Sequence, residues 1–323
     1  MKKLQILKVL PMKIRGRLYQ VDFRYENLQE IRIRAGQKVR LHYAGKEWIP
    51  KELEAYTVTV NDLEEMMEYI SQYSLYAFEQ EIKQGYITIE GGHRVGFVGK
   101  GLIERGQIKS MKYISSINVR VAHEVWGCAT DLMHYIVEKE MISHTLIISP
   151  PRCGKTTILR DLIRLISDGT DSIKGQTVGV VDERSEIGAC YQGVPQMHLG
   201  SRTDILDACP KAEGMMMLIR SMSPRVIAVD ELGMQDDVLA VEYAIHCGCK
   251  LITTIHGNSL NEIRKKYSLK RLLDSRVFER YILLSNQPKV GSIMEVYDGN
   301  YGGLYQSNRE CDDFDDRYFI RAK

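Results

Sequence analysis

A loop with the residue types that bind phosphate lies near the middle of the chain, in the stretch SPPRCGKTTILRD at residues 149–161. Gly154, Lys155 and Thr156 match the end of the motif G-x-x-x-x-G-K-[ST]. Ser149 takes the place of the first glycine, and two prolines follow it. Because serine is small and proline fixes φ, we expect a stiff loop that keeps its phosphate-facing N–H groups.

The apolar run HTLIIS before this loop predicts a buried strand, and TTILRDLIRLIS after it predicts a helix. A helix N-terminus favours an anion. Lys155 would reach the β- and γ-phosphates, and the Thr156 hydroxyl would bind Mg²⁺. The predicted nucleotide-binding residues are Pro151, Arg152, Cys153, Gly154, Lys155, Thr156 and Thr157.

A second apolar run, RVIAVDEL, ends in two adjacent carboxylates, Asp230 and Glu231. Enzymes that use a Mg²⁺-nucleotide need an acidic group at the end of such a strand. We therefore predict that Asp230 holds Mg²⁺ together with Thr156 and that Glu231 orients the attacking water. The alternative is a solvent-exposed Asp-Glu pair after a core strand.

Two more buried strands end in polar residues. KLITTIHG ends with His256, and TVGVVDERSEIG continues into Glu183 and Arg184. In a parallel sheet the carboxyl edge lines the ligand crevice. This predicts that His256 senses the γ-phosphate and that Glu183 polarises water. A structural histidine, and a solvated or subunit-bridging charge cluster, are the alternatives.

The surrounding sequence predicts two domains and a tail. Residues 1–125 have the hairpin and helix patterns of a small α+β domain, with residues 28–49 as a hairpin or meander and a helix capped by Asn61 or Asp62. Residues 126–300 alternate apolar runs with helical patterns, which indicates an α/β domain with a mainly parallel sheet and an antiparallel addition at residues 280–299. Residues 301–323 predict a poorly ordered tail.

The composition favours a cytoplasmic protein of the ordinary globular class. The chain has 323 residues, of which 44% are hydrophobic, and its net charge of +2 gives no support to a nucleic-acid partner. No apolar run approaches the ~18 residues of a membrane helix, so we expect no direct membrane insertion. Seven cysteines form no CxxC pair, which predicts reduced thiols and no zinc site.

Four of these stretches together resemble one superfamily. SPPRCGKTTILRD, VVDERSEI, LIRSMSPRVIAVDE and LITTIHG are similar to the P-loop, aspartate box, Walker B segment and histidine box of the type II and type IV secretion ATPases. GGHRVGFVGK and ISSINVRVA, upstream of the P-loop, narrow the resemblance to the stage III AA sporulation family of endospore-forming bacteria. The resemblance covers the chain from about Leu28 to Asp298.

The resemblance implies a RecA-like P-loop ATPase that uses ATP and Mg²⁺ and assembles into a ring, usually hexameric. It implies that Arg94 and Arg120 contact phosphates in trans, and it leaves Arg220 as either a ligand contact or a brace. The implied partners are membrane proteins of the sporulation channel between mother cell and forespore, which would bring the protein to the cytoplasmic face of the membrane. The chain departs from the pattern at Ser149 and at Asp230, where the motors usually carry glycine.

Other functions remain open on the sequence alone. The basic N-terminal arm would suit a nucleic-acid-dependent motor; it comprises Lys2, Lys3, Lys8, Lys13, Arg15 and Arg17. A small-molecule kinase is a weaker fit, because it must exclude water and leaves the first 125 residues without a role. A nucleotide-dependent scaffold without hydrolysis is the last alternative.

Overall fold

The computed structural model describes residues 2–71, 85–104 and 106–307 and divides the chain into two compact units. The N-terminal unit comprises residues 1–123 together with residues 189–197, and the C-terminal unit comprises residues 124–188 and 198–323. A single break after residue 125 was predicted. The segment at residues 189–197 was therefore assigned to the wrong part, because only tertiary contacts join it to the N-terminal unit.

A six-stranded antiparallel sheet forms the N-terminal unit. In spatial order its strands are β3 (Lys46–Trp48), β2 (Arg40–Tyr43), β1 (Leu28–Arg34), β6 (Gln107–Arg120), β5 (His93–Glu104) and β4 (Tyr86–Ile89). The meander predicted for residues 28–49 corresponds to β1, β2 and β3.

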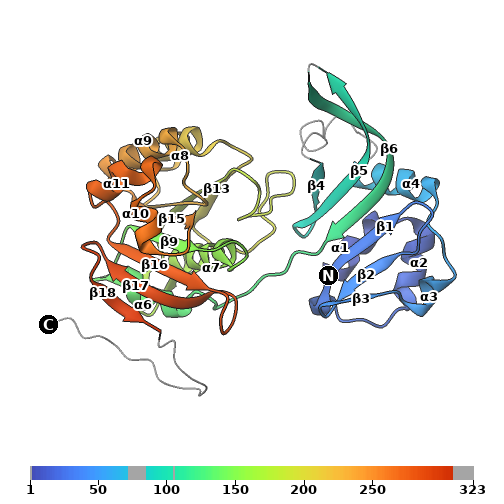
Figure 1. Ribbon diagram of the computed structural model, residues 1–323, viewed down its shortest axis with the longest axis horizontal. Helices are drawn as coiled ribbons and strands as arrows, with labels where there is room; N and C mark the ends of the chain where they lie inside the picture. The colour runs from blue at the N-terminus through green and yellow to red at the C-terminus, as the bar shows by residue number, and fades with distance from the viewer. Residues whose placement is uncertain (1, 72–84, 105, 308–323) are drawn as a thin grey trace. The chain divides into compact units, whose positions relative to one another are not determined.

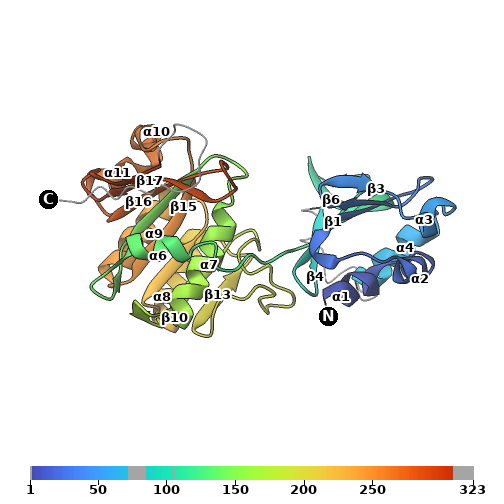
Figure 2. The same cartoon turned by 90° about the horizontal axis from the view of Figure 1, so that it is seen from below.

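Among the described residues, the helices of this unit lie on one face of the sheet, as Figure 2 shows. They are α1 (Lys2–Val9), α2 (Met12–Gln20), α3 (Lys51–Glu54) and α4 (Val60–Ile70), with a 3₁₀ turn at Tyr25–Asn27. Strand β1 shows the cause, because Ile31 and Ile33 are buried in the core while Arg32 and Arg34, one residue along, are only partly covered. The second face of the sheet is therefore polar and basic.

Helix α4 is capped by Thr59, so the prediction of Asn61 or Asp62 as the cap was wrong. The Thr59 hydroxyl accepts the Asp62 N–H at 3.2 Å, and the Asp62 carboxylate accepts the Thr59 N–H at 2.7 Å. This is a capping box, in which the acidic residue sits three positions inside the helix. The rest of the helical pattern predicted there, residues 72–84, lies outside the described residues.

An eight-stranded sheet forms the C-terminal unit, with the mixed α/β architecture that was predicted. Its order is β13 (Thr203–Asp207), β12 (Val178–Asp182), β14 (Val226–Val229), β15 (Lys250–His256), β9 (Thr145–Ser149), β16 (Arg280–Ser285), β17 (Ser292–Asp298) and β18 (Gly303–Gln306). The first six strands are parallel to one another. Strand β17 pairs antiparallel with β16, and β18 pairs antiparallel with β17. The prediction of a poorly ordered tail from Tyr301 onward was wrong for residues 303–306, because they form β18. Residues 308–323 lie outside the described part.

Helices cover both faces of this sheet (Figure 1). Helices α6 (Thr130–Ile136) and α7 (Lys155–Asp168) pack on one face, and α8 (Lys211–Met222), α9 (Gln235–His246), α10 (Leu260–Arg264) and α11 (Lys270–Asp274) pack on the other. In β9, Ile147 belongs to the first core, whereas Leu146 and Ile148 belong to the second. Double burial explains the continuous apolar runs in the sequence. Short ribbons β7–β8 (Val137–Glu138, Met141–Ile142) and β10–β11 (Gly169–Thr170, Ile173–Lys174) complete the unit, with a 3₁₀ turn at Tyr267–Leu269.

No helix in the described ranges is both long enough and apolar enough to span a bilayer.

The imidazole of His144 joins two strands of this sheet just before β9 begins. Its Nδ1 accepts the N–H of Leu251 at 3.2 Å, which requires an unprotonated nitrogen. Burial, and then the charge of Lys250, lower the pKa of His144. A histidine with a lowered folded pKa contributes stability above its unfolded pKa of about 6.5, and this contribution is lost as the pH falls.

We predict that His144→Asn removes part of the acid sensitivity of the C-terminal unit. The asparagine oxygen can accept the same N–H but does not titrate. Between pH 6.5 and 5 the wild type should lose about 1 kcal/mol more unfolding free energy than the variant. Urea unfolding at several pH values measures this, with His134→Asn, on the exposed side of α6, as the control. Parallel pH curves for wild type and His144→Asn would contradict the assignment.

Candidate nucleotide site

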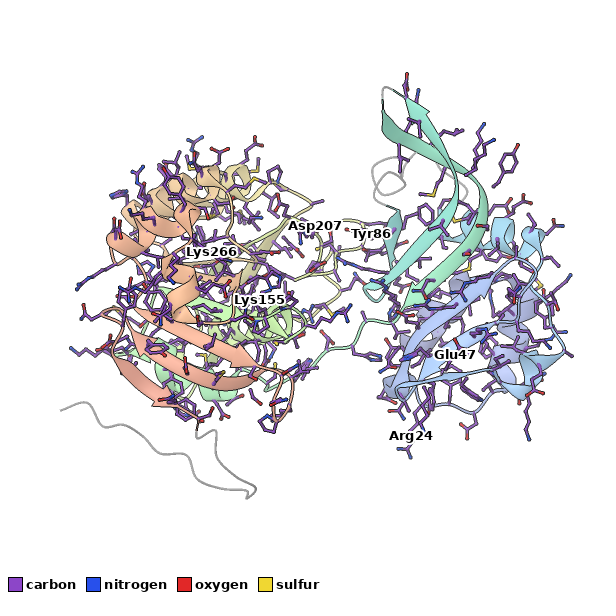
Figure 3. The ribbon with its side chains drawn as sticks, viewed as in Figure 1. Arg24, Glu47, Tyr86, Lys155, Asp207 and Lys266 are labelled. Atoms are coloured by element: carbon purple, nitrogen blue, oxygen red, sulfur yellow. The ribbon has the colours of Figure 1, made fainter. Side chains whose placement is uncertain are left out.

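The predicted phosphate loop connects the end of β9 to the start of α7. Two residues turn the chain through the left-handed region, Arg152 at φ 63° and Gly154 at φ 79°. A Cβ on Gly154 would also lie 3.0 Å from Val290 Cγ1. The backbone conformation therefore favours glycine at position 154, and a larger residue there would also have to displace Val290. Figure 3 labels Lys155, the first residue of α7.

Ser149 is the last residue of β9 rather than part of the turn. It is fully buried, pairs in register with His256, and its carbonyl accepts the N–H of Gly257 at 3.1 Å. Its φ lies outside the left-handed region. The loop therefore does not need a glycine at position 149, because the left-handed residues of the turn are 152 and 154.

The other predicted loop residues differ in exposure. Pro151 and Arg152 are exposed, Cys153 is buried, and Thr157 is half-buried in the first turn of α7. The Sγ of Cys153 lies 3.7 Å from the Pro151 carbonyl. The side chains at the tip of the loop are thus open to a ligand, while Cys153 anchors the loop underneath.

The carboxylate of Asp230 lies between two hydroxyl groups. Thr156 Oγ1 donates to one carboxylate oxygen at 2.7 Å, and Thr254 Oγ1 donates to the other. The two residues predicted to hold Mg²⁺, Thr156 and Asp230, are therefore in direct contact. A hydroxyl and a carboxylate side by side are oxygen ligands of the kind that Mg²⁺ prefers, so these residues fit the ion.

Lys155, His256 and Glu231 form a second chain of contacts. Lys155 Nζ lies 3.0 Å from Nε2 and 3.2 Å from Nδ1 of His256, and His256 Nε2 lies 3.4 Å from Glu231 Oε1. A proton on Nε2 satisfies both contacts, because Nδ1 is then free to accept from the lysine. Burial lowers the pKa of Lys155, and the carboxylates of Asp230 and Glu231 oppose that shift.

Glu231 has an unusual backbone and a second ion pair. Its φ is 58°, its N–H donates to Thr254 Oγ1 at 3.0 Å, and its Oε2 lies 3.2 Å from Arg184 Nη1. A non-glycine residue in the left-handed region is uncommon and concentrates at functional sites. The carboxylate oxygens contact one cation and one imidazole.

The aspartate-box segment is arranged differently from the prediction. Glu183 forms an ion pair with Lys211 at the start of α8, and it is the next residue, Arg184, that reaches Glu231. The sequence placed Arg184 only within a charge cluster and Thr254 only among the polar residues at a strand end, and it predicted neither contact with Glu231. The signal for Thr254 was its spacing two residues before His256, because alternate residues of a strand share a face.

Arg94 and Arg120 belong to the N-terminal unit, where they face each other across β5 and β6. With Arg32 and Arg34 they line a cavity of about 450 Å³ on the polar face of the sheet. Arg94 stacks on Tyr86 at 4.9 Å, and Arg120 lies 3.8 Å from Glu30. This arrangement gathers positive charge and is suited to an anion.

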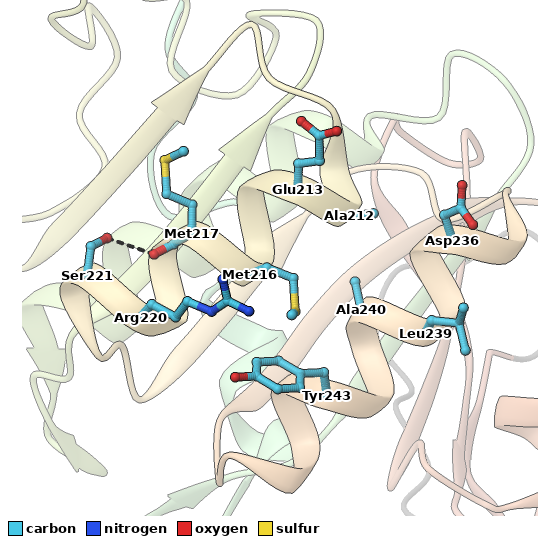
Figure 4. A pocket seen from close by; sticks show the side chains of 10 residues that line it. All are labelled: Ala212, Glu213, Met216, Met217, Arg220, Ser221, Asp236, Leu239, Ala240 and Tyr243. Carbon is cyan, nitrogen blue, oxygen red and sulfur yellow. Dashed lines mark hydrogen bonds between the residues drawn. The ribbon is translucent and has the colours of Figure 1, made fainter.

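Arg220 lines a different cavity, of about 790 Å³, between α8 and α9 (Figure 4). Met216, Leu239 and Tyr243 share that lining with it. Arg220 therefore belongs to the covering helices and not to the contacts around Asp230.

Comparison with solved structures identifies the class of fold. The pilus retraction motor PilT aligns with 94% of this chain and 84% of its own at a TM-score of 0.60 and 15% identity. The ATPase DotB of Legionella pneumophila aligns with 85% of this chain and 76% of its own at a TM-score of 0.56 and 16% identity. The chain thus has the RecA-like fold of the type II and type IV secretion ATPases.

Sequence comparison identifies the family within that class. The family described as "Sporulation stage III, protein AA" matches residues 1–303, and the chain belongs to it. Stage III sporulation protein AA of Bacillus subtilis (strain 168) is 43% identical over 295 residues, which are 91% of this chain and 94% of that protein. The sequence-based assignment is confirmed.

We predict unequal effects for two neighbouring threonines of β15. Thr254→Val removes a hydroxyl that both Asp230 and the Glu231 N–H use, and should lower the unfolding free energy by ~1–3 kcal/mol. Thr253→Val is the matched control, because Thr253 Oγ1 is buried without a hydrogen-bond partner among the described residues. That change should be neutral or stabilising in urea unfolding. Equal losses for the two variants would show that the Thr254 hydroxyl is not needed.

Proposed function

We propose that the protein is an ATP-hydrolysing, ring-forming motor of the secretion type that acts on a membrane channel during endospore formation. The observation that carries the proposal is the meeting of Lys155, Thr156, Asp230 and Glu231 at one edge of the parallel sheet. These are the groups that phosphoryl transfer to water requires. Family membership and the fold support the same conclusion.

The phosphate loop is built to bind the triphosphate. Backbone N–H groups from Arg152 to Thr156 stand at the N-terminus of α7, where a negative charge is favoured. Lys155 is 9% exposed and faces His256, so its ammonium is held at the bottom of the loop. A γ-phosphate that arrives there can take over a hydrogen bond that the lysine now makes with the imidazole.

Mg²⁺ would be held by Thr156 and Asp230, whose oxygens are 2.7 Å apart. The ion supplies charge neutralisation for the β- and γ-phosphates when bound. Thr254 holds the Asp230 carboxylate in place by donating a hydrogen bond to its other oxygen.

Glu231 is the base of the proposed reaction. It orients a water molecule whose oxygen forms a bond to the γ-phosphorus while the bond from that phosphorus to the bridging oxygen breaks. The proton of the water passes to the Glu231 carboxylate, and ADP and phosphate leave. His256 contacts both Lys155 and Glu231 and can couple the presence of the phosphate to the position of the base.

Positive charge from the N-terminal unit completes the proposed site in the assembled ring. Arg94 and Arg120, paired across two strands, would contact the phosphates bound by a neighbouring copy of the chain. An arginine supplied in this way can be worth ~10³ or more in rate. A ring of copies would then turn over ATP faster than a single chain, with membrane proteins of the sporulation channel as partners on the cytoplasmic side.

The basic N-terminal arm gives less support to a nucleic-acid-dependent motor than its sequence did. Lys8 pairs with Glu90 at 3.2 Å, Arg15 donates to the carbonyls of Lys8 and Leu10, and Arg17 stacks on Tyr56 at 4.7 Å. Much of the positive charge of the arm therefore serves the fold of the N-terminal unit.

We predict that two substitutions separate binding from hydrolysis. Lys155→Ala should abolish both nucleotide binding and ATP turnover. Glu231→Gln should retain nucleotide binding and lower turnover by ~10²-fold or more, because the amide cannot take the proton. Binding of a fluorescent ATP analogue and phosphate release measure the two steps. Mass analysis with and without ATP should show larger assemblies for Glu231→Gln, which keeps its nucleotide.

Lys174→Ala, an exposed lysine on β11, is the control for loss of a positive charge. It should leave binding and turnover as in the wild type. A wild-type protein that neither binds nor hydrolyses ATP would overturn the proposal. Binding with no hydrolysis in any assembly would leave the scaffold in its place, and stimulation by single-stranded DNA would favour the nucleic-acid motor.

A further inference from the structure

The turn after β12, residues 183–188, is tied to the core by a buried carboxylate. Asp182, the last residue of β12, is 2% exposed and accepts the N–H groups of Glu186, Ile187 and Gly188, each at 2.8 Å. Burial raises the pKa of Asp182 to about 6, and the three backbone N–H groups oppose that shift. The turn therefore has a defined backbone although most of its side chains reach solvent.

The same turn is held from a second side by α7, the helix that begins with Lys155. Arg160 donates to the carbonyl of Ile187 at 2.8 Å and to the carbonyl of Glu186 at 2.7 Å. The Ser185 hydroxyl donates to Asp207 of β13 at 2.5 Å. The backbone that carries Arg184 is therefore held by β12, by the neighbouring strand β13 and by α7.

Sheet order then determines where Arg184 can reach. Strands β12 and β14 are parallel neighbours in register, with Val181 opposite Val229. Arg184 follows the end of β12 and Glu231 follows the end of β14, so both side chains stand at the same edge. The guanidinium Nη1 lies 3.2 Å from Glu231 Oε2.

This ion pair contributes little to the stability of the fold. The Arg184 side chain is 67% exposed and the Glu231 side chain 36% exposed, and such exposed pairs are weak. A turn braced by Asp182 and Arg160 does not need the pair to hold its shape. What the pair does determine is the direction of the carboxylate, because Arg184 contacts one oxygen and leaves the other beside His256.

We propose that Arg184 is a positioning residue that acts on ATP hydrolysis through Glu231. The inference rests on the proposed function, since it needs Glu231 to be the base. Arg184 restrains the carboxylate to one orientation, so that the second oxygen is presented to the attacking water. Without the guanidinium, the carboxylate samples other rotamers and presents that oxygen for a smaller share of the time.

A double-mutant cycle tests this on the full chain, with the steady-state rate of phosphate release as the readout. Arg184→Ala should lower kcat by about tenfold and leave KM within about twofold, since the phosphate loop is untouched. In a Glu231→Ala background the same change should have no further effect, measured in single turnover at high protein concentration. Arg184→Lys should recover part of the rate, because a cation near Oε2 is restored.

Lys211→Met is the matched control, because it removes the ion pair of Glu183 on the same turn. It should keep the wild-type kcat, and thermal unfolding should show Arg184→Ala to be as stable as the wild type. An active wild type with an equally active Arg184→Ala overturns the inference and leaves the proposed function standing. Independent losses that multiply in the double variant also overturn it, since Arg184 would then act without Glu231. An inactive wild type overturns the proposed function itself.

Discussion

The carboxylate of Asp230 and its two hydroxyl donors form the contact on which the rest of the site depends. Thr156 belongs to α7, the helix that follows the phosphate loop, Thr254 belongs to β15, and Asp230 directly follows β14. The two hydroxyl donors fix both oxygens of this half-buried carboxylate. Because Thr254 also accepts the N–H of Glu231, the same hydroxyl that orients Asp230, the proposed Mg²⁺ ligand, holds the left-handed backbone of Glu231, the proposed base.

This contact is possible because parallel strands end at one edge of the sheet. The order β12, β14, β15, β9 brings four strand ends next to one another, and each supplies a different group. These are Arg184, Glu231 with Asp230, His256, and the phosphate loop. Both faces of the sheet are covered by helices, so the edge is the place where polar side chains can meet a ligand without breaking the core. The fold concentrates the chemistry there.

Local patterns were enough to predict the loop, the acidic strand end and the apolar strands of this unit. Glycine, lysine and threonine at fixed spacing indicate a phosphate loop directly. A strand that is covered by helices on both faces is apolar throughout, so its sequence is easily recognised. The ion pair between Arg184 and Glu231 could not be predicted, because it depends on β12 lying beside β14. No local sequence pattern predicts the order of the strands in the sheet. The same limit explains the segment at residues 189–197, which only tertiary contacts assign to the N-terminal unit.

The contacts at the site also bear on how tightly a nucleotide can bind. Lys155 already contacts His256, Thr156 already donates to Asp230, and Arg184 already pairs with Glu231. A triphosphate must replace some of these contacts rather than add to an empty surface, so part of its interaction energy is used to break them. In the proposed reaction, the γ-phosphate would draw Lys155, and the imidazole that contacts it, away from Glu231. Nucleotide binding and the release of the proposed base would then be coupled through His256.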